Sequence, residues 1–414
     1  MKIKKIYLTK SFTGFYFDDQ KAIKRGAQND GFMYQESPVV EGFTQVRQKG
    51  EAISIQIVLE NGVIGYGDCC AVQYSGVGGR DPLFLADDYI PFMEAKVIPL
   101  LMKEDIGRFR PLAEKYDRIV IDGKRLHTAI RYGITQAILS VTAKYRQMTM
   151  AELIRLEYNI NNKAYKSIPV FTQSGDDRYA SVDKMILKEV DVLPHALINS
   201  VPNKLGAEGE ILTKYVSWLS DRILKYRLRP DYQPIIHLDV YGTIGIIFDN
   251  DLEKIVDYML ELERLAKPFK LRIEGPIDGR NREETMTCLR DLTIMLDNRR
   301  SSIEIVADEW CNTLEDIIYF ADNKAGKMLQ IKCPDLGGIN NIIEAILYCN
   351  KKKIGSYCGG SCNETDISAK TTINIAIACD ADQFLAKPGM GVDEGYMIIK
   401  NEMERVLAIC RDRQ

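Results

Sequence analysis

Three acidic residues stand at regular intervals, each at the end of a short apolar run. They are Asp239 in "IIHLDVYG", Glu274 in "LRIEGP" and Asp308 in "IEIVADE", separated by 35 and 34 residues. Carboxylates that repel one another gather only around a cation, and a few hard oxygen ligands favour Mg²⁺. Any one of these acids alone would more often cap a helix or form a surface ion pair. Three at this spacing predict a metal site.

A lysine follows the third acid along the chain. Lys332 comes 24 residues after Asp308, in "LQIKCPDLGG", where apolar and polar residues alternate as they do in a strand. A lysine is rarely buried unless it is paired. Beside a divalent cation the ammonium form is disfavoured, which lowers the pKa and frees the amine to accept a proton. We therefore interpret Lys332 as a base and expect its pKa to lie below the usual value.

Eight apolar runs alternate with amphipathic helices from about residue 165 onward, and these elements would position the acids and the lysine. Residues 252–266, for example, carry apolar side chains along one helical face. The runs are "SIPVFTQ", "HALINSV", "IIHLDVYG", "LRIEGP", "IEIVADE", "MLQIKCP", "IGSYCGG" and "FLAKPG". Strands that alternate with helices in this way predict an α/β fold with a parallel barrel over residues 161–414, whose chemistry sits at the carboxyl ends of the strands.

The first 160 residues predict a separate α+β domain. The segment "EAISIQIVLENGVIGYGDC" indicates two strands joined at Asn61-Gly62, and helices are expected over about 85–102 and 127–146. The glycine-rich segment "QYSGVGGRDP" lacks the G-K-[ST] ending of a phosphate loop. It is either a mobile surface loop or a lid, and we expect residues 73–80 to order over the barrel when substrate binds.

Composition and net charge indicate which cellular compartment and which kinds of partner to expect. The 414 residues carry a net charge of −3, which gives no reason to expect nucleic acid or anionic lipid as a partner. We see neither a signal peptide nor an apolar run of about 18 residues, so no membrane span is expected. Ten cysteines without a C-x-x-C pair predict reduced thiols in a cytoplasm, and only three histidines argue against a histidine-built zinc site.

Asp–Glu–Asp on successive barrel strands, followed by lysine, resembles the enolase superfamily, whose sites pair a lysine or histidine base with Mg²⁺. Segments along the whole chain are similar in particular to the methylaspartate ammonia-lyase family. They include "TGFYFDDQ", "EGFTQVRQKGE", "GGRDPLFLA", "RLHTAIRYGITQAIL", "DVLPHALIN", "DVYGTIG", "VADEWCNT", "CNET" and "LAKPGMGVDEG". The resemblance implies a capping domain over residues 1–160, a modified (β/α)8 TIM barrel over 161–414, a homodimer, and a Mg²⁺ site with K⁺ as monovalent activator.

The reaction that the resemblance implies is the reversible elimination of ammonia from L-threo-3-methylaspartate to give mesaconate, a step in glutamate degradation. It would proceed by abstraction of the C3 proton and an enolate (aci-carboxylate) intermediate. A proton next to a carboxylate is a weak acid, because its removal places two charges on one group. Mg²⁺ at that carboxylate would stabilise the second charge electrostatically.

The resemblance also assigns roles residue by residue. Asp239, Glu274 and Asp308 match the Mg²⁺ ligands, Lys332 matches the base that takes the C3 proton, and His195 in "LPHALIN" matches the second catalytic residue across the substrate. Positions that match substrate-binding groups are Gln173, Gln330, Ser361, Cys362, Gln73 and Leu385. Of these, Gln73 and Leu385 would lie near the side chain and amine of the substrate, and Cys362 would contribute a backbone group.

Two positions depart from the family pattern, because Ser361 and Cys333 stand where relatives carry threonine. Ser361 keeps a hydroxyl, so we expect binding to persist with slightly looser packing. Strand alternation turns Cys333 away from the site. We likewise expect Glu309 to point out of the site and His237 to fill the barrel layer beneath the metal.

Two alternatives stay open on the sequence. Another lyase, dehydratase or racemase of the superfamily, acting on an amino or hydroxy acid, would share the proton abstraction, although "HALINSV" lacks the K-x-K pair of many racemases. The second is a catalytically inactive barrel that serves as a binding module. The intact acids and lysine disfavour it, and a Mg²⁺-dependent rise in ultraviolet absorbance would distinguish enzyme from binder.

Overall fold

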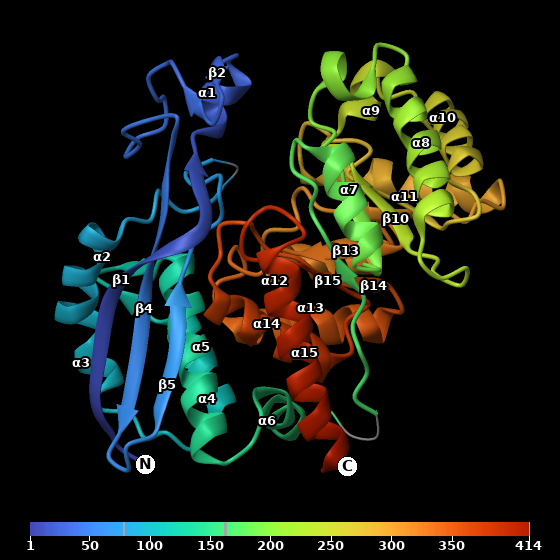
Figure 1. Ribbon diagram of the computed structural model, residues 1–414. Helices are drawn as coiled ribbons and strands as arrows, with labels where there is room; N and C mark the ends of the chain where they lie inside the picture. The colour runs from blue at the N-terminus through green and yellow to red at the C-terminus, as the bar shows by residue number, and fades with distance from the viewer. Residues whose placement is uncertain (78, 161–163, 414) are drawn as a thin grey trace.

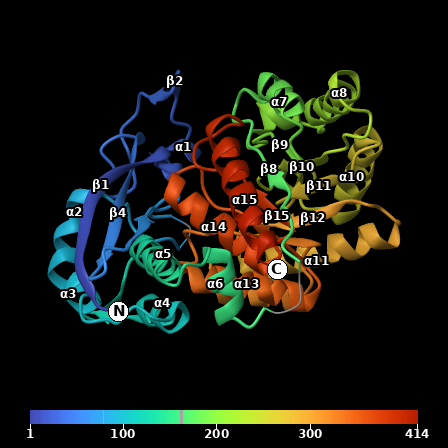
Figure 2. The same ribbon diagram turned by 60° about the horizontal axis from the view of Figure 1, so that its bottom comes forward.

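The computed structural model describes residues 1–77, 79–160 and 164–413 (Figure 1). A strand-rich amino-terminal part lies beside a closed barrel built from the rest of the chain (Figures 1 and 2). The predicted domain boundary after residue 160 falls beside residues 161–163, which lie outside the described residues, so it stays a prediction. None of the helices in the described residues combines the length and the apolar character needed to cross a membrane.

Three antiparallel strands form the sheet of the amino-terminal part, in the order β1–β4–β5. They are β1 (Ile3–Asp18), β4 (Arg47–Leu59) and β5 (Ile64–Cys69). β4 and β5 form the predicted hairpin, and Gly62 in its turn has a φ of 85°, which favours glycine. Along β4 the isoleucines at 53, 55 and 57 are buried and alternate with half-buried residues, so one face of the sheet supplies a core.

Helices and short strands complete the amino-terminal part. They are α1 (Gln20–Lys24), β2 (Asn29–Asp30), β3 (Met33–Tyr34), α2 (Ala86–Phe92), the π-helical turn η1 (Met93–Val97), α3 (Ile98–Leu101), α4 (Phe109–Arg118), β6 (Val120–Ile121), β7 (Lys124–Arg125), α5 (Thr128–Tyr145) and α6 (Met150–Glu157). The helix predicted over about 85–102 is therefore present as α2, η1 and α3 in succession, and the one predicted over 127–146 is α5.

Eight parallel strands close into the predicted barrel, in the order β10–β11–β12–β13–β14–β15–β8–β9. They are β8 (Val170–Phe171), β9 (Val192–His195), β10 (Ile235–Asp239), β11 (Leu271–Glu274), β12 (Glu304–Ala307), β13 (Met328–Ile331), β14 (Gly355–Cys358) and β15 (Gln383–Leu385). The second strand differs from the prediction. Only His195 of the run "HALINSV" belongs to β9, as its last residue; the rest of the run follows the strand, because His195, Ala196 and Leu197 all have positive φ and the extended strand ends there.

Helices surround the barrel strands (Figure 2). They are α7 (Arg178–Leu187), the π-helical turn η2 (Val201–Leu205), α8 (Glu210–Tyr226), α9 (Thr243–Ile247), α10 (Leu252–Ala266), α11 (Arg282–Asn298), α12 (Leu314–Asp322), α13 (Ile339–Lys352), α14 (Asp366–Cys379) and α15 (Glu394–Asp412). The apolar face predicted for residues 252–266 is the buried face of α10.

Helix α5 connects the two parts of the molecule, since it contacts β5 on one side and the barrel helices α13 and α14 on the other. Every residue from Ala129 to Ala143 is buried. Glycines allow this close packing: a Cβ on Gly133 would lie 2.5 Å from the Cys69 nitrogen, and one on Gly67 would lie 2.2 Å from the Gly133 carbonyl oxygen. A larger residue at either position would push the sheet away from the helix.

Asp117, near the end of α4, stabilises the same junction between the amino-terminal part and the barrel through charged hydrogen bonds. Its buried carboxylate accepts hydrogen bonds from Arg131 Nη1 at 2.7 Å, Arg125 Nη2 at 2.8 Å and the Gly338 backbone nitrogen at 2.9 Å. Burial acts to raise the pKa of this carboxyl, but Arg131, Gly338 and Arg125 outweigh burial and leave the pKa below its usual value. The amino-terminal part is thereby bonded to the start of α13.

Replacing Asp117 with alanine should destabilise the whole chain, because it leaves the buried Arg131 guanidinium without its carboxylate. Loss of one partner of a buried pair costs about 3–5 kcal/mol. Urea denaturation of both proteins measures the difference. Asp105→Ala, which removes a surface pair with Lys2, is the matched control and should leave the midpoint unchanged. Equal midpoints for wild type and Asp117→Ala would contradict this account of the junction.

Candidate active site

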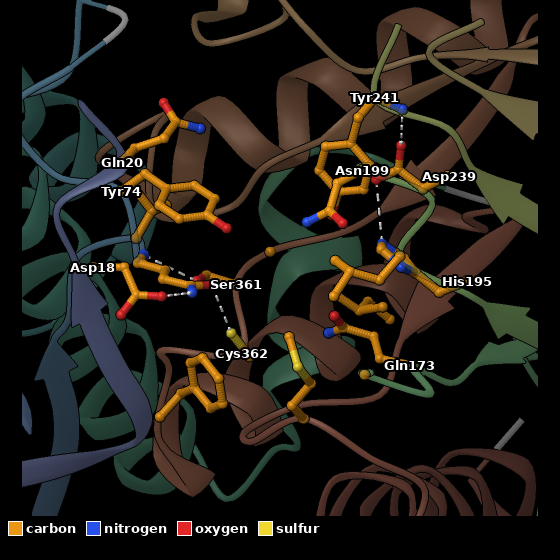
Figure 3. Close-up of a pocket in the computed structure, with 18 of the residues that line it drawn as sticks. Asp18, Gln20, Tyr74, Gln173, His195, Asn199, Asp239, Tyr241, Ser361 and Cys362 are labelled. Atoms are coloured by element: carbon orange, nitrogen blue, oxygen red, sulfur yellow. Dashed lines mark hydrogen bonds and ion pairs between the residues drawn. The ribbon is translucent and has the colours of Figure 1, made fainter. Parts of the chain in front are cut away.

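A cavity of about 540 Å³ opens at the carboxyl ends of the barrel strands, where the amino-terminal part covers them. Figure 3 shows Asp18 and Tyr74 on one side of it and His195, Asp239 and Tyr241 on the other. Ten of the eleven predicted site residues line this cavity. They are Gln73, Gln173, His195, Asp239, Asp308, Gln330, Lys332, Ser361, Cys362 and Leu385. The eleventh, Glu274, is fully buried beside it.

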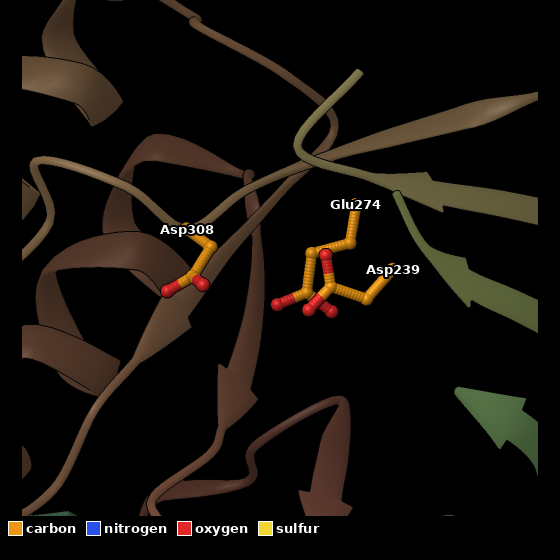
Figure 4. Close-up of side chains that lie close together, drawn as sticks. All are labelled: Asp239, Glu274 and Asp308. Atoms are coloured by element: carbon orange, nitrogen blue, oxygen red, sulfur yellow. The ribbon is translucent and has the colours of Figure 1, made fainter. Parts of the chain in front are cut away.

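The three predicted metal ligands converge as their spacing indicates. Asp239 and Glu274 are the last residues of β10 and β11 and stand opposite each other in register, and Asp308 directly follows β12. Each offers a carboxylate oxygen, and these oxygens lie within 4.8 Å of one another (Figure 4). Strands of one parallel barrel end at the same rim, so equal spacing along the sequence becomes proximity in space.

The electrostatics of this cluster call for a cation. Burial, followed by the negative charges of Asp239 and Asp308, raises the pKa of Glu274 well above its usual value. Three carboxylates that close cannot all stay ionised without a positive charge between them. Oxygen donors alone, from three side chains at the edge of a cavity with room for water or substrate, fit Mg²⁺.

Lys332 lies one residue beyond β13, and its Nζ is 2.8 Å from Asp308 Oδ1. Burial acts to lower the pKa of Lys332, but the charges of Asp308 and Glu309 outweigh burial and raise the pKa above its usual value. This direction holds for the protein by itself, because the charges nearest the amine are carboxylates; the predicted lowering concerns the site with a divalent cation bound and stays a prediction.

Glu309 was expected to point out of the site, and this is wrong. Its side chain lines the cavity together with Asp308. The expectation relied on strand alternation, but β12 already ends at Ala307, so alternation no longer governs the two acids. Glu309 adds negative charge next to Lys332.

His195 closes the opposite wall of the cavity from Lys332. β9 and β13 are separated by four strand steps in either direction around the closed barrel. The His195 Nε2 atom lies 3.3 Å from Asp239 Oδ2, and the backbone at His195 has a φ of 66° (Figure 3). The left-handed backbone at the end of β9 marks the point where the chain leaves the strand for the cavity rim.

Gln73 connects the amino-terminal part to the substrate loop predicted in "GGSCNET". Its backbone nitrogen donates to Ser361 Oγ at 3.2 Å, and its Nε2 donates to Asp18 Oδ2 at 2.6 Å (Figure 3). The Cys362 thiol donates to Gln73 Oε1 at 3.3 Å, and burial raises the pKa of this thiol to about 12, so it stays protonated. Cys362 therefore contributes its side chain, which the sequence did not predict.

The glycine-rich segment also contacts the barrel. Arg80 Nε donates to Asp335 Oδ2 at 2.9 Å, and Arg80 Nη2 donates to Asn312 Oδ1 at 3.4 Å. Residue 78 lies outside the described residues, and ordering of residues 73–80 on substrate binding stays a prediction. Cys333, in contrast, donates to the Gly359 carbonyl oxygen at 3.3 Å and does not line the cavity, as strand alternation predicts.

Several cavity residues were not found from the sequence. They are Asp18, Asn199, Tyr241, Glu309 and Tyr357. Tyr241 carried a usable signal, since it lies two residues after Asp239 in "DVYG". Asp18 carried none, because no local pattern reveals that this strand end reaches the barrel, whereas Tyr74 and Arg80 lie in the segment 73–80 that was predicted to cover it.

Family profiles match almost the whole chain. Residues 1–159 match the profile described as the methylaspartate ammonia-lyase N-terminus, and residues 162–412 match the profile described as its C-terminus. The methylaspartate ammonia-lyase of Clostridium tetanomorphum is 61% identical over 414 residues, which cover 100% of both chains. These matches span both parts of the fold.

Solved structures agree with the sequence matches. The Mg complex of beta-methylaspartase from Clostridium tetanomorphum superposes with a TM-score of 0.97 at 61% identity, covering 100% of both chains. Citrobacter amalonaticus methylaspartate ammonia lyase containing (2S,3S)-3-methylaspartic acid gives a TM-score of 0.97 at 52% identity, covering 99% of this chain and 100% of that one.

A more distant structure shares the fold alone. The muconate lactonizing enzyme of Pseudomonas fluorescens is 16% identical, with a TM-score of 0.60 over 92% of this chain and 87% of its own. Its likeness shows that the two chains share the barrel architecture. The methylaspartate ammonia-lyases, in contrast, agree with this chain over its full length, both in sequence and in three-dimensional structure. This chain therefore belongs to the methylaspartate ammonia-lyase family.

Proposed function

We propose that this protein catalyses the Mg²⁺-dependent, reversible elimination of ammonia from L-threo-3-methylaspartate to give mesaconate. The observation that carries the proposal is the cluster of three strand-end carboxylates within 4.8 Å, with the Lys332 amine 2.8 Å from one of them. Relatives that bind Mg and (2S,3S)-3-methylaspartic acid support the choice of cation and substrate.

Asp239, Glu274 and Asp308 would hold the Mg²⁺ ion. When bound there, the ion supplies positive charge that stabilises the negative charge developing on the substrate carboxylate as C3 loses its proton. The carboxylates that raise the pKa of Lys332 in the protein alone are then neutralised in part, which favours the neutral amine.

Lys332 acts as the base and His195 faces it across the cavity. Lys332 Nζ takes the proton from C3, the electron pair of the C3–H bond forms the C2–C3 double bond, and the C2–N bond breaks to release ammonia. Asp308 Oδ1, which lies 2.8 Å from Nζ, pairs with the Lys332 ammonium group that results. His195 lies on the opposite wall, where it can exchange the proton on the other face of C3.

The remaining predicted residues would bind and orient the substrate. Gln173, Gln330 and the loop with Ser361 and Cys362 line the cavity from the barrel, and Leu385 would border the 3-methyl group. The amide nitrogen of Gln73 is engaged by Asp18, and its oxygen, which accepts from the Cys362 thiol, has a second lone pair that can accept from the substrate amine.

Family membership supports further proposals about the assembly and its setting. We infer that residues 1–160 form an amino-terminal capping domain and residues 161–414 a catalytic barrel. Two copies of the chain would form a homodimer, and K⁺ would act as a monovalent activator. All ten cysteines are free thiols, which supports a reducing cytoplasm as the site of action in glutamate degradation.

An ammonia-release assay on the purified full chain tests the proposed reaction. Ammonia should form from 3-methylaspartate in the presence of Mg²⁺, with a parallel rise in ultraviolet absorbance from mesaconate. Aspartate should react far more slowly, and glutamate should not react. Release that is unaffected by exhaustive chelation, or a preference for another substrate, would overturn the proposal.

Asp239→Asn should weaken Mg²⁺ binding and bring turnover close to background, because it removes a charged oxygen ligand while preserving shape. Calorimetric Mg²⁺ titration, turnover and circular dichroism together separate metal loss from unfolding. Asp257→Asn, which alters a surface acid 3.2 Å from Arg299, is the matched control and should retain both binding and activity. Normal Mg²⁺ affinity in Asp239→Asn would exclude Asp239 as a ligand.

Lys332→Ala and His195→Ala should separate the two faces of C3. Loss of a general base commonly costs about 10²–10⁴-fold in rate, so the lysine variant should lose turnover of the threo substrate. The histidine variant should be slowed but more stereoselective. Solvent-deuterium incorporation at C3 and deamination of both diastereomers are the measurements. If Lys332→Ala still exchanges the threo proton at the wild-type rate, lysine is not the base.

A further inference from the structure

His237 occupies the centre of the barrel, directly beneath the acids. It lies in β10 two residues before Asp239 and is fully buried. The Phe171 ring stacks on it at 4.2 Å with an interplanar angle of 8°, and the Tyr357 ring meets it edge-on at 5.7 Å. These rings confine the plane of the imidazole, so its two nitrogens point in fixed directions. The sequence suggested only that His237 fills a layer of the barrel.

The contacts of His237 Nδ1 identify which ring nitrogen carries the proton. Gln383 Nε2 lies 3.0 Å from Nδ1, and Arg272 Nη1 donates to Gln383 Oε1 at 2.6 Å. A guanidinium can only donate, so the amide oxygen of Gln383 must face Arg272 and the amide nitrogen must face the imidazole. Nδ1 therefore accepts a hydrogen bond and carries no proton.

The single proton of the neutral ring is then on Nε2, which faces the metal site. Nε2 lies 2.9 Å from Glu274 Oε2, although this contact falls short of hydrogen-bond geometry, and neither atom has a hydrogen-bond partner among the residues that the structure describes. Arg272 is itself held by Glu304 Oε2 at 2.6 Å. One line of polar contacts thus runs across the barrel floor from Glu304 through Arg272, Gln383 and His237 to Glu274.

Glu274 Oε1 accepts from Gln330 Nε2 at 2.6 Å, and Oε2 faces His237 Nε2 at 2.9 Å with no hydrogen-bond partner among the described residues. We propose that His237 is a positioning residue for the metal site: its Nε2–H, set by Arg272 through Gln383, meets the Glu274 carboxylate and limits it to the orientation that faces Asp239 and Asp308. A neutral donor orients the carboxylate without cancelling the negative charge that a cation requires. The inference rests on the proposed Mg²⁺ site and concerns the residues that shape it.

Nitrogen-15 NMR of the full chain tests the tautomer directly. The sequence has only three histidines, so protein labelled with ¹⁵N-histidine yields three sets of ring signals that single substitutions can assign. The set that disappears in His237→Gln should be that of a neutral ring protonated at Nε2. A ring protonated at Nδ1, or at both nitrogens, would overturn the proposal without any variant having to retain activity.

Metal affinity tests the consequence. His237→Leu should bind Mg²⁺ about 10–100-fold more weakly in calorimetric titrations without substrate, the usual effect of losing a group that orients a metal ligand. His237→Gln keeps a donor and should recover part of the affinity, while Gln383→Leu, which frees the tautomer, should lie between wild type and His237→Leu. His127→Leu, which removes a buried histidine bonded to the Pro82 carbonyl, should lower thermal stability but leave Mg²⁺ affinity unchanged.

Mg²⁺ binding and the role of His237 can be tested separately. Wild-type protein that binds no Mg²⁺ would overturn the proposed function and the role of His237 with it. Wild-type affinity in folded His237→Leu, or in Gln383→Leu should the first variant not fold, would overturn the role of His237 alone. Affinity loss in His127→Leu equal to that in His237→Leu would show a general effect of destabilisation and equally overturn the proposal.

Discussion

Repulsion between three buried carboxylates is the constraint around which the rest of the site is arranged. Like charges within 4.8 Å of one another destabilise the fold unless something offsets them, and burial together with the charges of Asp239 and Asp308 raises the pKa of Glu274. Each acid faces a nitrogen from another element: His195 for Asp239, Gln330 for Glu274 and Lys332 for Asp308. These contacts hold the acids apart and aim them, but only a cation neutralises them. Lys332, the proposed base, thus also stabilises the cluster of acids.

The barrel alone does not make a selective site, because its rim is closed by the amino-terminal part. Helix α5 carries Tyr132, whose hydroxyl donates to Glu364 Oε1 at 2.7 Å. The same carboxylate pairs with the fully buried Lys387 at 2.9 Å and accepts from the Ser361 nitrogen at 3.0 Å. The loop that presents Ser361 and Cys362 is therefore shaped from both parts of the molecule at once. The packing between the two parts therefore helps to determine the shape of the cavity. This explains why α5 packs so closely against both parts.

Part of this arrangement can be predicted from the sequence because it depends only on the spacing of residues along the chain. The 35- and 34-residue intervals predict one strand and one helix per acid, and a closed parallel barrel leaves a single rim for all strand ends. The placement of Lys332 one strand further on follows for the same reason. The prediction fails where the chain leaves the strands. Glu309 follows the end of β12, and "HALINSV" turns at His195 through three left-handed residues, so alternation applies to neither.

By itself, then, the sequence determined the barrel, the family and the three acids that meet at the barrel rim, since each follows from local spacing or from long matching segments. Only the tertiary structure decided which charges surround each group. Lys332 faces carboxylates that raise its pKa, and a hydrogen bond to Asp18 orients the side-chain amide of Gln73. The hydrogen bond from Arg272 to Gln383 fixes the amide that faces His237, and so determines the tautomer of this histidine. These partners are far apart in the chain, and a Coulomb or hydrogen-bond energy depends on distances in space, which no sequence interval encodes.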